Sequence, residues 1–559
     1  MAKLFPGTGS LKLAFNGVGN LAIASIVTLG LISGMLISLL LGISLIINSD
    51  QPLLGLGIAI AGTLVFNLVF FFVAPFLLDL SQGWLYKTKW ISLSELAKLS
   101  PKAAEVLQKV CSQQKIKQPR LGLIDDQNPT AFTYGSLRDQ SRLVVSAGLF
   151  TYLDDEEVAT VYAHELGHIV HWDFAVMTLA STLVQIMYLV YVFARRLRSG
   201  KSKEAAQTAA LVAYVFYWVG TYMLLYLSRT REYFADKFAA ETTANPNALA
   251  RALVKIAYGI LTERERSGEV SQLTEGTRAL GIYDPKAAAA TGNAYRISSN
   301  QAQVSRVFLW DLFNPWASLL ELNSTHPLTG KRIRALSNYA EQLDQPVDFD
   351  LAPIIAMGRG LDSKRLYGDF ALDIVCNFAP LIGMIIGLIS GKLLLNGAFL
   401  AGGLLGIGIG LLVKAWTHFP AYDFAKLNDI LSLMADPYAS PLRGQPTRLA
   451  GELIGRGDAG NQYGSDLKLK DQTGMIYLRY VSRFGSIGNF WFGMRRVKGL
   501  IGTQVKTLGW FRRGVAPWVD LVQLKSSSGT VVNSYPRWWA YFIAIACCVV
   551  GVGLLLVKL

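Results

Sequence analysis

Two histidines and a glutamate within residues 163–169 have the types and spacing needed for metal chemistry. His164 and His168 are four positions apart, so on a helix both imidazoles project from one face and can bind one tetrahedral zinc ion. Glu165 lies beside them, where its carboxylate can accept a proton from zinc-bound water. The alternative is a helix with two incidental histidines. With five histidines in the whole chain, the motif favours a hydrolytic zinc site.

A site of this kind needs a third protein ligand, and a carboxylate on a second helix is a common solution. Glu232 and Asp236 are four positions apart and would share a helix face, which makes Glu232 the candidate. The alternative is the solvated, charged start of a helix. The longer motif with a third histidine is excluded because Phe174 stands at that position, although His171 is a less favoured candidate.

The elements around the motif are those that would position it. Residues 121–124 and 142–146 have the apolar, β-branched composition of strands, and residues 84–119 are largely amphipathic with helical spacing. Four acidic residues at 154–157 open the motif helix, where the helix dipole favours negative charge. The sequence therefore predicts a strand followed by a metal-binding helix.

The composition is that of a membrane protein. Of the residues, 52% are hydrophobic and 16% charged, and the mean hydropathy is positive. Long apolar runs occupy about residues 21–47, 53–78, 174–193, 211–227, 372–389, 398–412 and 539–557. If Glu232 and His164 bind one ion, an even number of crossings must separate them. The two runs between them satisfy this requirement.

The net charge of +14 fits cytoplasmic loops that face anionic lipid. The segments placed opposite the N-terminus carry few cations, so the positive-inside rule predicts a cytoplasmic metal site. Five cations between positions 195 and 203 are the exception, and that hairpin either spans the membrane, lies along it or protrudes from it. The four cysteines have no metal-binding or disulfide spacing.

Residues 423–536 form a basic, β-rich segment with short alternating stretches at 448–454, 475–478 and 505–510. We expect a small antiparallel β unit, with an OB-type barrel as one architecture. Sixteen Lys or Arg stand against seven Asp or Glu in residues 426–537. Residues 490–496 set large apolar side chains against cations. They are either a β-hairpin loop or a patch that enters the headgroup region or holds unfolded substrate, and nucleic-acid binding is a weaker option.

These patterns divide the chain into seven parts. They are two transmembrane helices (1–80), a first catalytic part (81–173), an apolar helical hairpin (174–228), a second catalytic part (229–370), a transmembrane hairpin (371–414), a basic β-rich domain (423–536) and a C-terminal transmembrane helix (539–558).

Four segments together resemble the HtpX-type family of membrane zinc endopeptidases, relatives of the eukaryotic CAAX prenyl protease. They are HELGH at 164–168, REYFAD at 231–236, THP followed by RI at 325–333, and the strand-like residues 128–135. Pro129 and Thr130 depart from the usual Asn-Ala-Phe run of that strand. The resemblance covers about residues 80–340, and the part beyond about residue 370 has no match in it.

The resemblance implies a role for each matching residue. His164, His168 and Glu232 would hold one zinc ion per chain, and Glu165 would be the general base. Asp236 would orient a ligand histidine, and His326 would stabilise the oxyanion with help from Arg332. Substrate would pair with the preceding strand, whose candidate residues are Asn128, Thr130, Ala131, Phe132 and Thr133.

The expected fold is a mainly α-helical multi-pass membrane protein with a zincin-type (gluzincin) α+β catalytic domain and a small β-rich C-terminal domain. The expected function is zinc-dependent endopeptidase activity on misfolded or membrane proteins, from the cell (inner) membrane and on its cytoplasmic side. The alternatives are a specific processing protease for membrane-associated or lipidated substrates, and a scaffold in which zinc is structural. Protein or peptide substrates and the lipid bilayer are the expected partners, nucleic acid is not, and the oligomeric state is left open.

Overall fold

The computed structural model describes residues 52–196, 203–267, 282, 291, 301–393, 398–457 and 463–558. The predicted apolar run at 21–47 lies outside this part of the chain, as do most of residues 268–300. Two compact units share the residues. The first comprises 1–256, 273–284 and 321–349, and the second comprises 257–272, 285–320 and 350–559. Each unit is described by itself.

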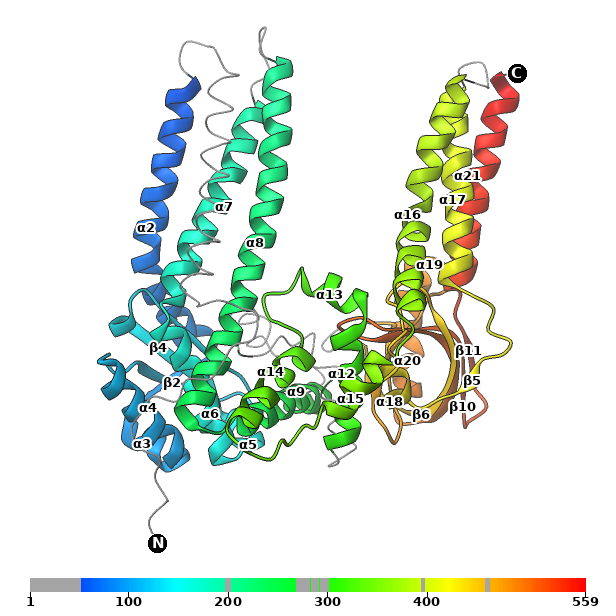
Figure 1. Ribbon diagram of the computed structural model, residues 1–559. Coiled ribbons are helices and arrows are strands. Elements are labelled where there is room, and N and C mark those ends of the chain that lie inside the picture. Colours follow the sequence, from blue (N-terminus) through cyan, green and yellow to red (C-terminus); the bar gives the residue numbers. More distant parts are fainter. Residues whose placement is uncertain are drawn as a thin grey trace. The chain divides into compact units, whose positions relative to one another are not determined.

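The first unit contains a four-stranded sheet on which helices pack, and three long helices, α2, α7 and α8, extend away from the sheet (Figure 1). Its elements are α2 (Pro52–Leu85), β1 (Lys89–Ile91), α3 (Leu93–Leu99), α4 (Pro101–Gln114), β2 (Arg120–Ile124), β3 (Ala131–Gly135), η1 (Arg138–Gln140), β4 (Ser141–Ser146), α5 (Ala147–Tyr152), α6 (Asp155–Val170), α7 (Asp173–Arg196), α8 (Lys203–Thr243), the first half of α9 (Pro246–Ser267) and α14 (Thr329–Gln342).

The strand order is β1-β2-β4-β3, which leaves β3 at one edge. β2 and β4 are parallel, whereas β3 is antiparallel to β4. The strands predicted at 121–124 and 142–146 are confirmed as β2 and β4. The helix that carries the His-Glu-x-x-His motif, α6, packs against β3, α4 and α8, so the sheet and two helices enclose it.

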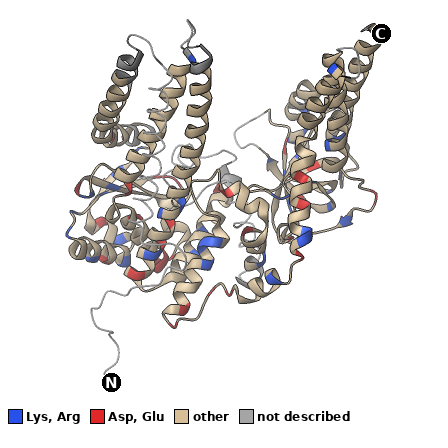
Figure 2. Ribbon diagram, turned by 45° about the horizontal axis from the view of Figure 1, so that its top comes forward, with Lys and Arg blue, Asp and Glu red and all other residues tan. Residues whose placement is uncertain are grey.

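Three helices of this unit are long and apolar enough to cross a membrane: Ile60–Leu80 in α2, Asp173–Arg195 in α7 and Gln207–Thr243 in α8. Apolar side chains such as Leu211, Trp218 and Tyr226 are exposed along α8, as expected of a surface that faces lipid. Charged residues gather away from the long apolar stretches (Figure 2). The predicted apolar runs at 53–78, 174–193 and 211–227 are therefore confirmed as helices.

The second unit combines three further candidate spans with a barrel. Its elements are the second half of α9, α12 (Gln301–Phe313), α13 (Pro315–Glu321), α15 (Ala352–Arg359), α16 (Ser363–Leu393), α17 (Phe399–His418), β5 (Lys426–Leu427), α18 (Ile430–Met434), β6 (Gln445–Arg456), β7 (Leu467–Lys470), β8 (Met475–Arg479), α19 (Gly485–Arg495), α20 (Val497–Leu500), β9 (Gln504–Arg512), β10 (Trp518–Ser526), β11 (Val531–Asn533) and α21 (Pro536–Lys558).

α16, α17 and α21 pack side by side and are the second set of candidate spans (Figure 1). Glycine permits the closest approach between the first two. A Cβ atom built at Gly406 would lie 1.8 Å from the carbonyl oxygen of Gly383. Small residues of this kind allow helix backbones to contact one another in lipid. The predicted apolar runs at 372–389, 398–412 and 539–557 are confirmed.

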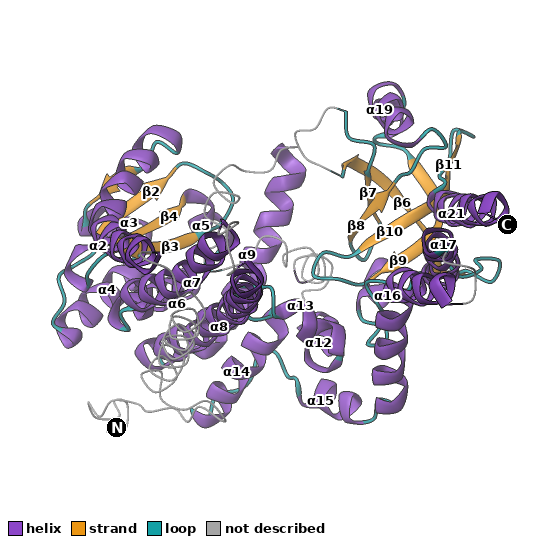
Figure 3. Ribbon diagram, turned by 90° about the horizontal axis from the view of Figure 1, so that it is seen from above, coloured by secondary structure: helices purple, strands orange, loops and turns teal. Residues whose placement is uncertain are grey.

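Five strands of this unit close into a barrel in the order β6-β7-β8-β10-β9, with β9 returning to β6 (Figure 3). β8 and β10 pair in parallel, and the other four pairs that close the barrel are antiparallel. The expectation of a purely antiparallel unit is therefore wrong, because α19, α20 and β9 intervene between the two parallel strands. A closed five-stranded barrel with this Greek-key path is the OB-type architecture.

Residues 490–495 of the aromatic segment belong to a helix, α19, and Arg496 is the C-cap of this helix, so the interpretation of the segment as a β-hairpin loop is wrong. Phe492 is buried, and its ring stacks on that of Tyr480 with centroids 3.9 Å apart. Ile487, Trp491 and Met494 follow helical spacing and are exposed. Helical periodicity thus buries Phe492 against Tyr480, directly after β8, and leaves Ile487, Trp491 and Met494 on the surface. The proposed contact of this patch with lipid or substrate stays a prediction.

Candidate metal centre

The motif helix α6 is well defined at its start because Asp154 and Glu157 form a capping box, in which each side chain accepts a hydrogen bond from the other residue's backbone N–H. Most of its residues are buried. Gly167 sets the approach of α8, since a Cβ atom there would lie 3.2 Å from Ala235 Cα and 3.3 Å from Phe238 Cβ. The small glycine therefore lets the two helices that carry the candidate ligands come close together.

His164, His168 and Glu232 meet where α6 and α8 pack. One candidate ligand atom of each lies within 4.8 Å of the others. The two Nε2 atoms are 3.2 Å apart, and each is 3.6 Å from an oxygen of Glu232. The structure therefore brings together the three residues that the sequence singled out as zinc ligands.

The remaining nitrogen of each histidine faces a carboxylate. His164 Nδ1 lies 3.0 Å from Asp236 Oδ1, and His168 Nδ1 lies 2.5 Å from Asp173 Oδ2. A carboxylate at Nδ1 holds the proton on that nitrogen and leaves the Nε2 lone pair available for a metal. Two such lone pairs beside a carboxylate are a donor set suited to zinc. The arrangement thus fits a divalent metal on the chemistry of its residues.

An arginine supports each of these carboxylates. Arg332 donates to both oxygens of Asp236, from Nε at 2.8 Å and from Nη2 at 2.6 Å, and its Nη1 lies 3.3 Å from Glu232 Oε2. Arg231 forms an ion pair with Asp173 and also donates to the carbonyl of His171. Both guanidinium groups are buried. The carboxylates beside the histidines are therefore held in position by buried cations.

The family resemblance implies that Arg332 helps His326 at the oxyanion, and this role stays a prediction; in the structure its guanidinium contacts Asp236 and Glu232. Sequence reasoning missed Asp173 and Arg231 altogether. The available signal was local, because Asp173 stands three positions after the last residue of the motif helix and Arg231 directly precedes Glu232. His171, the less favoured ligand candidate, lies outside the cluster and packs its ring against Phe234 and Phe238.

Burial shapes the electrostatics of the centre. It raises the pKa of Glu165 to about 8, and the nearby charge of Glu232 adds to this effect. It lowers the pKa of His168 to about 4 and also lowers the pKa of His164. Both imidazoles are therefore neutral at physiological pH, which is the form that binds metals.

His326 lies on the loop before α14 and reaches the cluster, with Nε2 3.6 Å from Glu232 Oε1. Its Nδ1 is 2.9 Å from the hydroxyl of Thr325. α8 holds this loop, because Arg229 donates to the carbonyl groups of Glu321 and Ser324. The segment 325–333, which contains His326, is thereby brought to the metal centre.

The predicted substrate-binding residues lie on or directly before β3. Thr133 is next to Glu165, and its hydroxyl lowers the pKa of that carboxyl in part. Phe132 is buried in the sheet, while Thr130 donates its N–H to the Ser146 hydroxyl. Asn128 belongs to the turn before the strand, where its amide donates to Asp126.

The outer edge of β3 already carries one contact from the chain itself. Because the carbonyl of Thr130 accepts from Ser146 N–H, the next carbonyl, that of Ala131, faces away from β4. It accepts a hydrogen bond from Ile282 N–H at 3.1 Å, and the Ile282 carbonyl accepts from Arg332 at 2.8 Å. This edge therefore accepts main-chain partners from outside the sheet.

Comparison with known proteins agrees with this geometry. Residues 97–340 match the family model described as Peptidase family M48, and this region contains every candidate ligand. Over residues 97–340 the chain is therefore similar to peptidase family M48. The resemblance seen in the sequence motifs is thereby confirmed, and the region is called the M48 domain from here on.

Three relatives, each described as "Protease HtpX homolog", illustrate the similarity. The protein of Methanothermobacter thermautotrophicus is 28% identical over 248 residues, which are 43% of this chain and 89% of the relative. That of Pyrococcus furiosus is 27% identical over 322 residues, 56% of this chain and 96% of the relative. That of Acidiphilium cryptum is 36% identical over 160 residues, 28% of this chain and 56% of the relative. No solved structure gives a significant match.

Proposed function

We propose that this chain is a zinc-dependent endopeptidase that hydrolyses peptide bonds of misfolded or membrane proteins. The M48 domain and the six candidate spans support a membrane metalloprotease. The observation that carries the finer proposal is the cluster of His164, His168 and Glu232 with Glu165 beside it. A glutamate that is not a ligand serves no purpose in a structural zinc site, but it is needed for hydrolysis.

Zinc held by this cluster would supply Lewis acidity toward a peptide carbonyl and toward a water molecule. Glu165 accepts the proton of the attacking water and passes it to the leaving amine. Its raised pKa suits both steps, because a catalytic acid–base works best near the ambient pH. His326, beside Glu232, is placed to donate a hydrogen bond to the oxyanion. Arg332 and Asp173 act as positioning residues through the carboxylates and imidazoles that they contact.

Peptide substrates would add to β3 as a further strand. The strand lies at the edge of its sheet, and Thr133 lies next to Glu165. Main-chain pairing recognises the backbone of a substrate and tolerates many side chains, which suits degradation of unfolded proteins.

The centre lies close to the membrane surface. Tyr226, the last strongly exposed apolar residue of α8, precedes Glu232 by six positions, and these span about 9 Å of helix axis. Substrates that emerge from the bilayer or lie on it would therefore reach the site directly. α7 and α8 run out and back (Figure 1), so α6 and Glu232 would lie on one side of the membrane that these helices cross. By the positive-inside rule, this side is the cytoplasmic face of the cell (inner) membrane.

The test is cleavage of casein, an unfolded substrate, by the detergent-solubilised full-length protein and by Glu165→Gln, each assayed for bound zinc. We expect the variant to keep its zinc and to lose at least about a hundredfold in rate, the size of a general acid–base contribution. Glu156→Gln is the matched control, since Glu156 is on the same helix but exposed and paired with Lys102. Cleavage by zinc-loaded Glu165→Gln at the wild-type rate would refute the mechanism.

Two alternatives are separated by further outcomes of this assay. A specific processing protease would cleave one membrane-associated or lipidated substrate and leave casein and other unfolded chains intact. A zinc-stabilised scaffold would bind zinc and cleave nothing in a broad substrate panel, and its function would survive Glu165→Gln.

A further inference from the structure

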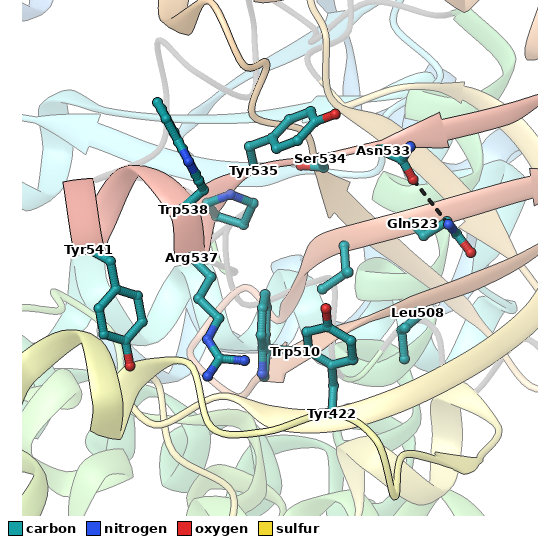
Figure 4. A pocket seen from close by; sticks show the side chains of 12 residues that line it. Tyr422, Leu508, Trp510, Gln523, Asn533, Ser534, Tyr535, Arg537, Trp538 and Tyr541 are labelled. Carbon is teal, nitrogen blue, oxygen red and sulfur yellow. Dashed lines mark hydrogen bonds between the residues drawn. The ribbon is translucent and has the colours of Figure 1, made fainter.

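A cavity of about 710 Å³ lies in the second unit, where the barrel meets the first turns of α21 (Figure 4). Its wall is built by the outer faces of β9, β10 and β11, by Tyr422 from the link after α17, and by Arg537, Trp538 and Tyr541 of α21. It is separate from the M48 domain, and the proposed peptidase mechanism makes no use of it. Its volume falls within the range of small-molecule sites.

The charge in this cavity has one sign. Arg537 is the only ionised side chain among the described residues that line it. No carboxylate of the described chain lies within 4.0 Å of its guanidinium. Instead, the guanidinium carbon lies 5.9 Å from the ring centroid of Tyr422 and 5.7 Å from that of Tyr541. In Figure 4, Arg537 extends between Tyr541 on one side and Trp510 and Tyr422 on the other. A half-buried cation without a counter-ion is suited to an anionic ligand.

The location of the cavity indicates where that anion comes from. The candidate span Pro536–Val557 begins at the cavity wall, and Trp538 and Phe542 are exposed along it. Trp416 is exposed near the end of α17, the neighbouring span. Tryptophan and tyrosine concentrate at the depth of lipid headgroups. The cavity therefore opens at the depth where phospholipid phosphates lie.

The lining also suits the rest of a lipid headgroup. Gln523 and Asn533 are exposed on neighbouring strands and hydrogen-bond to each other at 3.0 Å, which leaves further amide donors and acceptors toward the cavity. Leu508, Tyr535 and Trp538 add apolar surface. The cavity thus combines polar and apolar groups in one site. Its arginine suits a phosphate, its amides suit the hydroxyl groups of a headgroup, and its aromatic rings suit the glycerol and the upper acyl chain.

We propose that this cavity binds the phosphate and polar headgroup of an anionic phospholipid at the membrane surface. The bound lipid would connect α21 to the barrel wall, so that the barrel is held at the headgroup region by a specific lipid as well as by its helical anchors. This inference does not depend on the peptidase activity.

The experiment is native mass spectrometry of the full-length protein in detergent, titrated with phosphatidylglycerol or with phosphatidylcholine of the same acyl chains. We expect wild type to retain the anionic lipid about tenfold more tightly, and Arg537→Gln to lose that preference. Arg537→Lys should keep part of it, because a lysine supplies charge without the bidentate geometry. The thermal unfolding midpoint in detergent, which Arg537→Gln should leave unchanged, reports that the variant is folded.

Arg483→Gln is the matched control, because Arg483 is exposed just before α19 and does not line the cavity. An equal loss of preference in both variants would show diffuse surface charge and overturn the proposal. Displacement of phosphatidylglycerol by millimolar inorganic phosphate or glycerol 3-phosphate would identify a soluble phosphate compound as the occupant, which overturns the lipid assignment. Displacement by a single-stranded oligonucleotide would do the same in favour of nucleic acid.

Discussion

From the contact between Asp173 and His168 we predict how much the zinc affinity falls when Asp173 loses its charge. Asp173 Oδ2 lies 2.5 Å from His168 Nδ1, and both the carboxylate and its cation Arg231 are buried. Asp173→Asn keeps the shape of the side chain but removes its charge, so the imidazole loses both its orientation and part of its basicity. Changes of this kind weaken metal binding about 10- to 100-fold, which is about 1.4–2.8 kcal/mol.

The buried cation adds a second effect that must be separated from the first. In Asp173→Asn, Arg231 loses its ion-pair partner, and breaking a buried pair costs about 3–5 kcal/mol of folding stability. The double variant Asp173→Asn/Arg231→Gln removes both charges, so we expect it to recover much of this stability. Its zinc affinity should remain low, because His168 still has no carboxylate.

The assay is competition for zinc against a fluorescent chelator at buffered free zinc, alongside thermal unfolding of the metal-free proteins. Glu156→Gln, an exposed change on the motif helix, controls for the loss of one negative charge. A wild-type zinc dissociation constant for folded Asp173→Asn would show that Asp173 does not position His168, and the reasoning would be refuted.

Three further predictions concern pH and packing. Burial lowers the pKa of His168 to about 4, so we expect the zinc affinity to stay nearly constant between about pH 7.5 and about pH 6. Histidines with an ordinary pKa would take up protons in this interval and bind zinc more weakly. A steep loss of zinc affinity between these pH values would show that His168 is protonated there. In Gly167→Val, the added side chain should push α8 away from α6 through Phe238. We expect a lower zinc content and a loss of about 1–3 kcal/mol of folding stability, measured by thermal unfolding. An unchanged zinc content would contradict this prediction. Gly406→Leu should separate α16 from α17, because even a Cβ atom at this position would overlap the backbone of Gly383. We expect a lower unfolding midpoint in detergent. A midpoint equal to that of wild type would show that the two helices do not pack this way.

The fold was accessible from the sequence wherever the signal is local. Apolar runs in the sequence coincide with every candidate span that the structure describes, although the sequence left open whether the hairpin 174–228 crosses the membrane. Alternating segments predicted three barrel strands, β6, β8 and β9. The pairing of the strands was not accessible, since the parallel contact of β8 with β10 joins segments separated by α19, α20 and β9. The helical state of α19 was also missed, because a short aromatic run has no period long enough to distinguish helix from strand.

In the candidate metal centre too, the sequence predicted some features and only the tertiary structure showed the others. By itself, the sequence determined that His164 and His168 share a helix face, since four residues are about one helical turn, and that Glu232 could join them after an even number of crossings. Only the tertiary structure decided which charges surround these residues. Asp173 reaches His168 through a turn, and Arg332 reaches Asp236 and Glu232 from a helix about a hundred positions away. Such partners depend on how helices pack in three dimensions, and no periodicity along the chain encodes that packing.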